Sequence, residues 1–221
     1  MRREDGTPSS LFLFNHLITT ILEEELMLDI DEGIQQDEPD SITPLRIGAI
    51  ILRFPQSCDQ GKLAAIASNP RIAKNLSAES CAVKCNQLDN FSGRTLIIAN
   101  SLNQPLGMIG YQPDHTNANH MLSIWLDEAC WNRGYGTLAT QAMLDLAFSK
   151  DNLDCIFALA RVSSMASKRL LEKCGFQYCG TGMTRSAFYK GMIPPDRFKL
   201  DRRVWQALRD WNHLTPNKGA A

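Results

Sequence analysis

A glycine-rich turn is the segment of this sequence best suited to chemistry. It follows an apolar run that ends at Leu126 and precedes a helical pattern. The first N–H groups of a helix have no intrahelical partner, and the helix dipole adds positive potential there. Because glycines let a phosphate approach the backbone and Arg133 adds a positive charge, the turn predicts a pyrophosphate site. It consists of the consecutive residues Trp131, Asn132, Arg133, Gly134, Tyr135, Gly136 and Thr137.

The same turn also fits a competing motif, the dinucleotide fingerprint G-x-G-x-x-A, through Gly134, Gly136 and Ala139. That reading would make the protein a nicotinamide-dependent oxidoreductase. The fingerprint requires the turn to follow its strand directly and an acidic residue to end the next strand. Here Leu126 lies eight positions before Gly134, and Asp154 precedes the next apolar run. The sequence therefore disfavours this alternative.

The elements that position the turn predict a mixed α/β domain. A crossover through the helix expected at 137–149 requires parallel pairing of the strands that it joins, whereas neighbours joined by short loops pair as hairpins. We expect strands at 47–54, 94–99, 106–111, 121–126, 155–160, 176–183, 187–189 and 198–200, and helices at 63–76 (broken near residue 69), 137–149 and 164–174.

Two motifs in this order resemble those of the GNAT N-acetyltransferase superfamily. Segment 123–137 is similar to its motif A, a strand followed by [QR]-x-x-G-x-[GA] and a helix, with Trp131 at the first bracketed position. Segment 164–176 is similar to the N-x-x-S…E-K-x-G-F motif of the RimJ/RimL-like branch, which acetylates ribosomal-protein N-termini. The resemblance spans about residues 45–206.

This resemblance implies an α/β (α+β) fold with a mixed, mostly antiparallel sheet that is splayed between two parallel central strands and flanked by helices. It also implies acetyl-CoA as co-substrate and no metal. The pantetheine arm would lie between the splayed strands and bond the strand edge at Ile124, Trp125 and Leu126. A backbone N–H near Leu126 would stabilise the thioester oxyanion. Ser164 stands where the family has an asparagine that touches the cofactor.

Direct attack of an amine on a thioester needs a deprotonated amine, a stabilised oxyanion and an acid for the departing thiolate. The resemblance assigns the acid role to Ser167, the motif serine. The alternative is that Ser167 only belongs to the start of the helix and that water donates the proton to the thiolate. Other family members use a tyrosine, and this chain has Leu171 there. The general base stays open between His120, Asp127, Glu128 and a water-mediated route.

We therefore expect an acyltransferase that moves an acetyl group to a primary amine. The acceptor is a protein N-terminus, with ribosomal proteins included, or a small molecule. The main alternative is an acetyl-CoA-binding module without turnover, because Ser164 replaces the asparagine and the tyrosine is missing.

Composition restricts the class of protein. The chain has 221 residues, 44% of them hydrophobic, which suffices for a globular core. Residues 1–45 hold two basic and eleven acidic side chains, a charge of −9, so the remainder carries +8 of the net −1. A mildly basic domain suits an anionic ligand and does not indicate nucleic acid. Seven scattered cysteines indicate reduced thiols rather than a disulfide framework or a metal site.

The N-terminal segment predicts an appendage. We expect residues 1–44 to form an acidic helical extension and linker, residues 45–210 the acetyltransferase domain, and residues 211–221 a tail. The extension helix would pack on its own domain or on a second subunit of a homodimer, and the alternative is a disordered or partner-binding arm. Its apolar stretch at 11–22 is too short to span a bilayer. We expect a cytoplasmic protein without membrane contact.

Overall fold

The computed structural model describes residues 44–76, 94–114, 119–186 and 188–214. They belong to one compact unit, residues 42–221. The predicted N-terminal helix and linker, Cys81 and Cys85 lie outside the described residues. Within the described part, no helix has the length and apolar character needed to cross a membrane.

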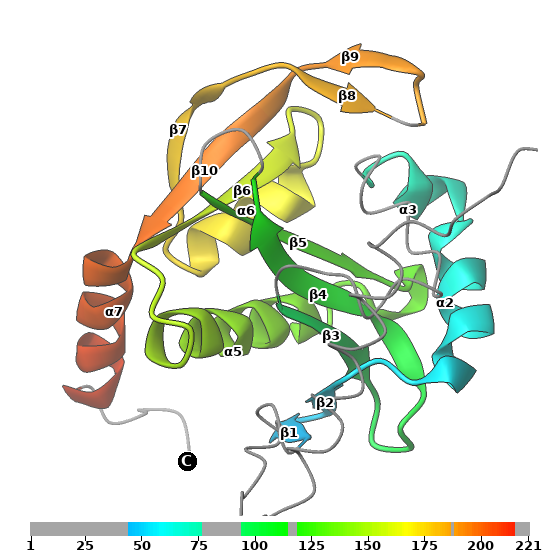
Figure 1. The fold of residues 1–221 in the computed structure, drawn as a ribbon, viewed down its shortest axis with the longest axis horizontal. Helices are drawn as coiled ribbons and strands as arrows, with labels where there is room; N and C mark the ends of the chain where they lie inside the picture. Colours follow the sequence, from blue (N-terminus) through cyan, green and yellow to red (C-terminus); the bar gives the residue numbers. More distant parts are fainter. Residues whose placement is uncertain (1–43, 77–93, 115–118, 187, 215–221) are drawn as a thin grey trace, which may run out of the picture. The chain divides into compact units, whose positions relative to one another are not determined.

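A mixed sheet of eight strands forms the centre of the domain, in the order β1-β2-β3-β4-β5-β6-β10-β7 (Figure 1). Every neighbouring pair is antiparallel except β5 and β6, which are parallel. This confirms the expected architecture. The strands are β1 (Leu45–Ile47), β2 (Ile50–Arg53), β3 (Arg94–Ala99), β4 (Pro105–Pro113), β5 (His120–Leu126), β6 (Cys155–Arg161), β7 (Gln177–Thr181) and β10 (Pro195–Asp201), while β8 (Thr184–Ser186) and β9 (Gly191–Ile193) form a separate pair.

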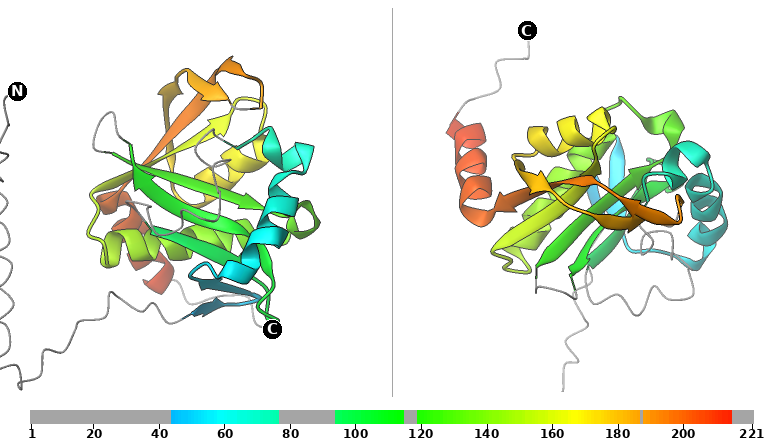
Figure 2. Two further views of the ribbon diagram at one scale, coloured as in Figure 1. Left: turned by 45° about the vertical axis from the view of Figure 1, so that its right-hand side comes forward. Right: turned by 90° about the horizontal axis from the view of Figure 1, so that it is seen from above.

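Helices cover the two faces of the sheet differently (Figure 2). α5 (Tyr135–Ser149), α6 (Met165–Lys173) and α7 (Arg202–Leu214) contribute to the larger apolar cluster on one face. α2 (Gln60–Ala67) and α3 (Pro70–Ala73) cover part of the other face. The period of two in strand side chains separates the clusters. On β5, Leu122 and Leu126 belong to the α5 side, whereas Trp125 belongs to the α2 side.

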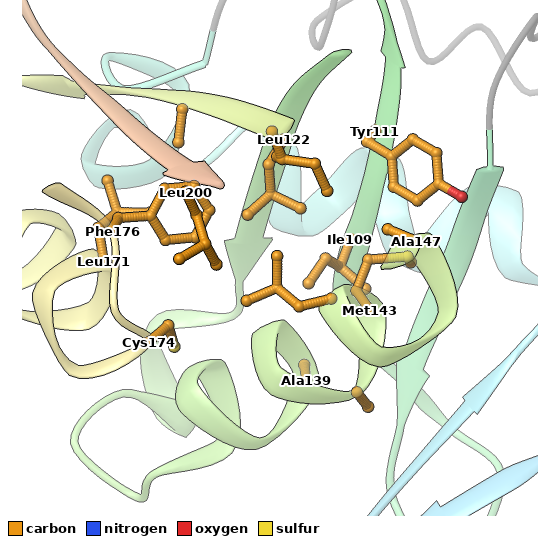
Figure 3. Packing of buried hydrophobic residues seen from close by; sticks show 14 of the residues in the cluster. Ile109, Tyr111, Leu122, Ala139, Met143, Ala147, Leu171, Cys174, Phe176 and Leu200 are labelled. Atoms are coloured by element: carbon orange, nitrogen blue, oxygen red, sulfur yellow. The ribbon is translucent and has the colours of Figure 1, made fainter. Parts of the chain in front are cut away.

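The larger cluster holds α5 against the centre of the sheet. Figure 3 shows Ile109 and Leu122 from neighbouring strands above Ala139 and Met143 of α5. Burying each large apolar side chain contributes about 1.5–3 kcal/mol to stability. The helix that carries the glycine-rich turn is therefore fixed by its apolar face, and its first residues, 135–138, are only partly buried.

The structure corrects three predicted elements. The strand expected at 47–54 is a hairpin of β1 and β2, because Gly48 takes a positive φ of 56° and reverses the chain. The strand expected at 187–189 is wrong: Phe188 and Tyr189 lie in a turn before β9, and Lys190 has a φ of 53°. α5 begins at Tyr135, two residues before the expected start.

Helix α7 was missed, and it continues past residue 210. In the structure the Nε atom of Arg202 donates to the carbonyl of Leu153 at 2.7 Å, and Trp205 Nε1 donates to Asp145 at 3.0 Å. These long-range contacts, together with Leu208 packed on Gly175, determine the helix.

Candidate functional site

Strands β5 and β6 separate along their length. They pair only over residues 120–122 of β5 and 156–158 of β6. Each strand stays paired with its outer neighbour, β5 with β4 up to Leu126 and β6 with β10 up to Arg161. The edge of β5 at Ile124, Trp125 and Leu126 therefore makes no ladder bonds to β6. This confirms the predicted splay and leaves backbone amides of β5 facing the gap.

The three residues of this edge differ in where their side chains lie. Ile124 and Leu126 pack with the α5 side of the sheet. Trp125 packs with the α2 side and is buried, and its Nε1 atom has no hydrogen-bond partner among the described residues. The Trp125 carbonyl lies beside Gly107 of β4, so the backbone groups of this edge that face the gap are those of its neighbours Ile124 and Leu126. The carbonyl of Leu126 accepts a hydrogen bond from Trp131 Nε1 at 3.0 Å, which ties the turn to the strand edge.

The predicted turn leads into α5 through left-handed backbone. Asn132 and Gly134 have φ values of 59° and 78°, and both are exposed together with Arg133. The N–H of Leu138 donates to the carbonyl of Gly134 at 3.1 Å, which is the first helical bond. The three preceding amides, those of residues 135–137, have no intrahelical acceptor. This arrangement supplies the donors that the sequence predicted for a pyrophosphate.

Gly136 is the point where three elements of the site meet. A Cβ atom there would lie 2.7 Å from Leu170 Cδ1 on α6, 3.6 Å from Leu126 Cδ1 and 4.0 Å from Ile124 Cδ1 on β5. A glycine fits here because any side chain would force Leu170 out of its position between α6 and the start of α5. The turn, the strand edge and α6 are thus contiguous, as a site for one extended ligand requires.

The two motif serines lie at the beginning of α6. Ser164 is the N-cap residue, and its carbonyl accepts the N–H of Lys168 at 3.2 Å. Its Oγ atom does not cap the helix and lies 2.8 Å from Ser167 Oγ. Leu171, at the position of the family tyrosine, is buried in the larger cluster with 3% exposure. The structure therefore brings Ser164 and Ser167 together and excludes Leu171 from the gap.

An ion pair fastens α6 to the outer strands. Lys168 Nζ lies 2.5 Å from Asp196 Oδ2 on β10, and Thr181 of β7 donates to Asp196 Oδ1 at 2.9 Å. The hydrogen bonds from Lys168 and then Thr181 lower the pKa of Asp196. Because this carboxylate is ionised and satisfied, its role is to position the helix that carries Ser167.

The candidate bases lie in different places. Glu128 accepts hydrogen bonds from Arg71 and from Asn69 Nδ2, the latter at 3.2 Å, and so joins the start of α3 to the turn. Asp127 accepts the N–H of Ala129 at 3.2 Å. His120 begins β5, six residues or about 20 Å along the strand from Leu126. The structure thus places both carboxylates, and not His120, at the turn.

Sequence reasoning missed the contribution of α3 to this turn. Arg71 bonds Glu128 and also lies 5.4 Å from the centre of the Trp131 ring. The pair Asn69-Pro70 was read only as a helix break, although an asparagine before a proline is also a helix-start signal. In the described ranges, no group of three or more His, Cys, Asp or Glu side chains is placed to hold a metal ion.

The sequence and the fold are both similar to those of known proteins. Residues 49–177 match the family described as acetyltransferase (GNAT) domain. The uncharacterized N-acetyltransferase YnaD of Bacillus subtilis (strain 168) is 32% identical over 82 residues, which cover 37% of this chain. That match spans 44% of the length of YnaD, less than half of the relative.

Solved structures share the fold at low identity. Ribosomal-protein-S5-alanine acetyltransferase from Vibrio fischeri is 13% identical with a TM-score of 0.61, covering 74% of this chain and 98% of its own. Spermidine N-acetyltransferase from Vibrio cholerae, in complex with CoA and spermine, is 14% identical with a TM-score of 0.61 and covers 72% and 99%. These two proteins differ in acceptor, so the shared fold does not select one.

Proposed function

Because the chain belongs to the GNAT acetyltransferase family, we propose that it transfers the acetyl group of acetyl-CoA to a primary amine by direct attack. The observation that carries this proposal is the meeting of three elements at Gly136. The first turn of α5 and Arg133 would hold the pyrophosphate, and the open edge at Ile124 and Leu126 would bond the pantetheine amides.

The chain's own groups supply the acid and the oxyanion donor for the transfer, and water takes the proton that the amine releases. The new C–N bond forms as the C–S bond breaks, so the amine must lose a proton and the departing thiolate must gain one. We assign the second proton to Ser167, whose hydroxyl is in contact with that of Ser164. Ser167 recovers its proton from the Ser164 hydroxyl, and Ser164 in turn takes up the proton that the amine released to water. A backbone N–H at the β5 edge near Leu126 would stabilise charge on the thioester oxygen.

We propose a polypeptide N-terminus as the acceptor. The support is the RimJ/RimL-like spacing of Ser164 and Ser167, which the structure shows on the first turn of one helix. The catalytic domain would span residues 45–214, because α7 continues past the expected boundary at 210, with the acidic extension at 1–44. We place the reaction in the cytoplasm, where the exposed free thiols of Cys58 and Cys179 would stay reduced.

Two measurements test the proposal. Acetyl-CoA should raise the melting temperature of the full chain, because a ligand that binds only the folded state stabilises it, and NADH should not. Thiol release from acetyl-CoA should then accelerate with an amine acceptor. Stabilisation without release for every amine would leave a binding module without turnover. Stabilisation by NADH alone would contradict the family's chemistry for this chain.

A further inference from the structure

The sheet face that α2 and α3 partly cover continues onto β6 and β10, where it is cationic. On β6, Ile156, Ala158 and Ala160 are buried in the larger cluster, so the alternating residues point to the opposite face. In the pairing of β6 with β10, Arg197 stands opposite Leu159 and Lys199 opposite Phe157. We call Phe157, Leu159, Arg161, Arg197 and Lys199 the cationic sheet face.

Two guanidinium groups on this face make no ion pair with the residues that the structure describes. Arg161 donates to the carbonyl of Lys74 at 3.1 Å and stacks on the Tyr189 ring at 4.7 Å. Arg197 lies 5.6 Å from the centre of the Phe157 ring. No carboxylate of the described residues lies within ion-pair distance of Arg161 or Arg197. Lys199, by contrast, is neutralised by Asp201 at 2.7 Å.

The cationic sheet face borders the gap between β5 and β6. Leu159 and Arg161 belong to the part of β6 that no longer pairs with β5, and Leu159 remains 39% exposed. On the opposite face the gap is bordered by α5 and α6, which are in contact at Gly136 and Leu170. An amine that enters the gap from the face opposite α5 and α6 therefore passes Arg161, with Arg197 on the next strand, β10.

From this charge and geometry we propose that the acceptor is a polypeptide whose N-terminal residues carry acidic side chains. This rests on the proposed acetyl transfer. Unpaired guanidinium groups bind carboxylates through strong, charge-assisted hydrogen bonds. They also repel cations, so an acceptor with several positive charges is disfavoured. The cationic sheet face thus selects acceptors by the charge of the side chains that lie near the reacting amine.

Exposed apolar side chains around Arg161 favour a polypeptide over a small anionic amine. The Tyr189 ring, on which Arg161 stacks, is 48% exposed. Val162, next to Arg161, and Met165, at the start of α6, are also exposed, as is Phe188, which packs edge to face on Tyr189. A single amino acid cannot cover both the guanidinium groups and these side chains, whereas several residues of an extended chain can.

The test compares peptides of equal length that differ only in charge. Each begins with serine, followed by two glutamates, two glutamines or two lysines. We expect kcat/KM in the order Glu, Gln, Lys, with about tenfold or more between the extremes. Raising the salt concentration should shrink this ratio, because solvent screens charges at a surface. Free glutamate and spermidine serve as the small anionic and the polycationic acceptors.

Arg197→Glu removes a cation of the face that makes no hydrogen bond among the described residues. This variant should lose the preference for the Glu peptide by about tenfold while changing kcat/KM for the Gln peptide less than about threefold. The matched control is Arg203→Glu on α7, an exposed arginine that lies outside the cationic sheet face. It should behave as wild type.

Equilibrium binding of the same peptides to the complex with CoA separates this proposal from the proposed function. If no amine is acetylated but the Glu peptide still binds about tenfold tighter than the Lys peptide, the acetyl transfer is wrong and the acidic preference holds. The acidic preference would be overturned if the enzyme preferred the Lys peptide or spermidine. It would also be overturned if Arg197→Glu kept the wild-type ratio of kcat/KM between the Glu and Lys peptides. If free glutamate were as good an acceptor as the Glu peptide, the acceptor would be a small anionic amine rather than a polypeptide.

Discussion

The hydroxyl oxygens of Ser164 and Ser167 lie 2.8 Å apart on the first turn of α6. Ser164 occupies the N-cap position without capping the helix, so its side chain is available to Ser167. A serine hydroxyl is a poor acid by itself, and a neighbouring hydroxyl that can return a proton improves it. The short distance between the two hydroxyls therefore supports the proposed role of Ser167 as a proton donor.

Replacement of Ser167 by alanine should lower kcat by about 10²-fold or more, with acetyl-CoA affinity nearly unchanged, if Ser167 protonates the thiolate. Ser164→Ala keeps the Ser167 hydroxyl and should reduce kcat less. Steady-state kinetics with a cognate amine and calorimetric titration of acetyl-CoA check both. A Ser167→Ala enzyme that retains more than about a third of the wild-type kcat would make water the donor.

Substitutions at Gly134 and Gly136 should impair the protein for different reasons. At Gly134 a Cβ atom has open space, but the φ of 78° disfavours any L-residue, so Gly134→Ala should cost about 1–2 kcal/mol of stability. Gly134→Asn should cost less, because asparagine tolerates this backbone. At Gly136 alanine must displace Leu170, which should weaken acetyl-CoA binding. Denaturation and calorimetry distinguish the two, and equal stability of all three variants would refute the φ argument.

Trp131→Phe removes one hydrogen bond and keeps an aromatic ring under Arg71. The donor to the carbonyl of Leu126 is lost, which should lower the free energy of unfolding by about 0.5–1.5 kcal/mol. Because that bond fixes the turn against the β5 edge, acetyl-CoA should also bind more weakly. Trp205→Phe removes an indole donor far along the chain and serves as the control: it should leave affinity unchanged.

The buried pair of Arg53 and Asp59 predicts a pH-dependent stability. Both of its hydrogen bonds are 2.7 Å long, and the side chains are 5% and 3% exposed. Burial alone would raise the pKa of Asp59, but hydrogen bonds from Arg53 and the backbone of Gln56 outweigh it and lower that pKa. The stabilisation is therefore present above the unfolded pKa of about 3.9 and is lost as the pH falls through the folded pKa.

Breaking this pair should be costly. Asp59→Ala leaves Arg53 buried without its partner and should lower the free energy of unfolding by about 3–5 kcal/mol at pH 7. The double variant Arg53→Met, Asp59→Leu should recover most of this loss, because no charge stays buried. Urea unfolding at pH 7 and pH 3 measures both effects. A single variant as stable as the double one would show that the pair is not buried in solution.

Local patterns in the sequence were sufficient for the turn that begins α5, for the helix that starts near Ser164 and for the parallel pairing around the crossover, whereas the resemblance singled out the two motif serines. Those features depend on neighbouring residues: glycines that admit a left-handed backbone, a serine at a helix start, and a helix too long to join antiparallel neighbours directly.

Tertiary structure decided the rest. The charge count indicated a basic domain, but only the register of β6 and β10 places Arg197 opposite Leu159. Helix α7, the bond from Arg71 to Glu128 and the contact of Gly136 with Leu170 join residues more than 30 positions apart. Such contacts leave no local pattern, because their free energy comes from packing and pairing across the sheet rather than from the conformational preferences of each segment.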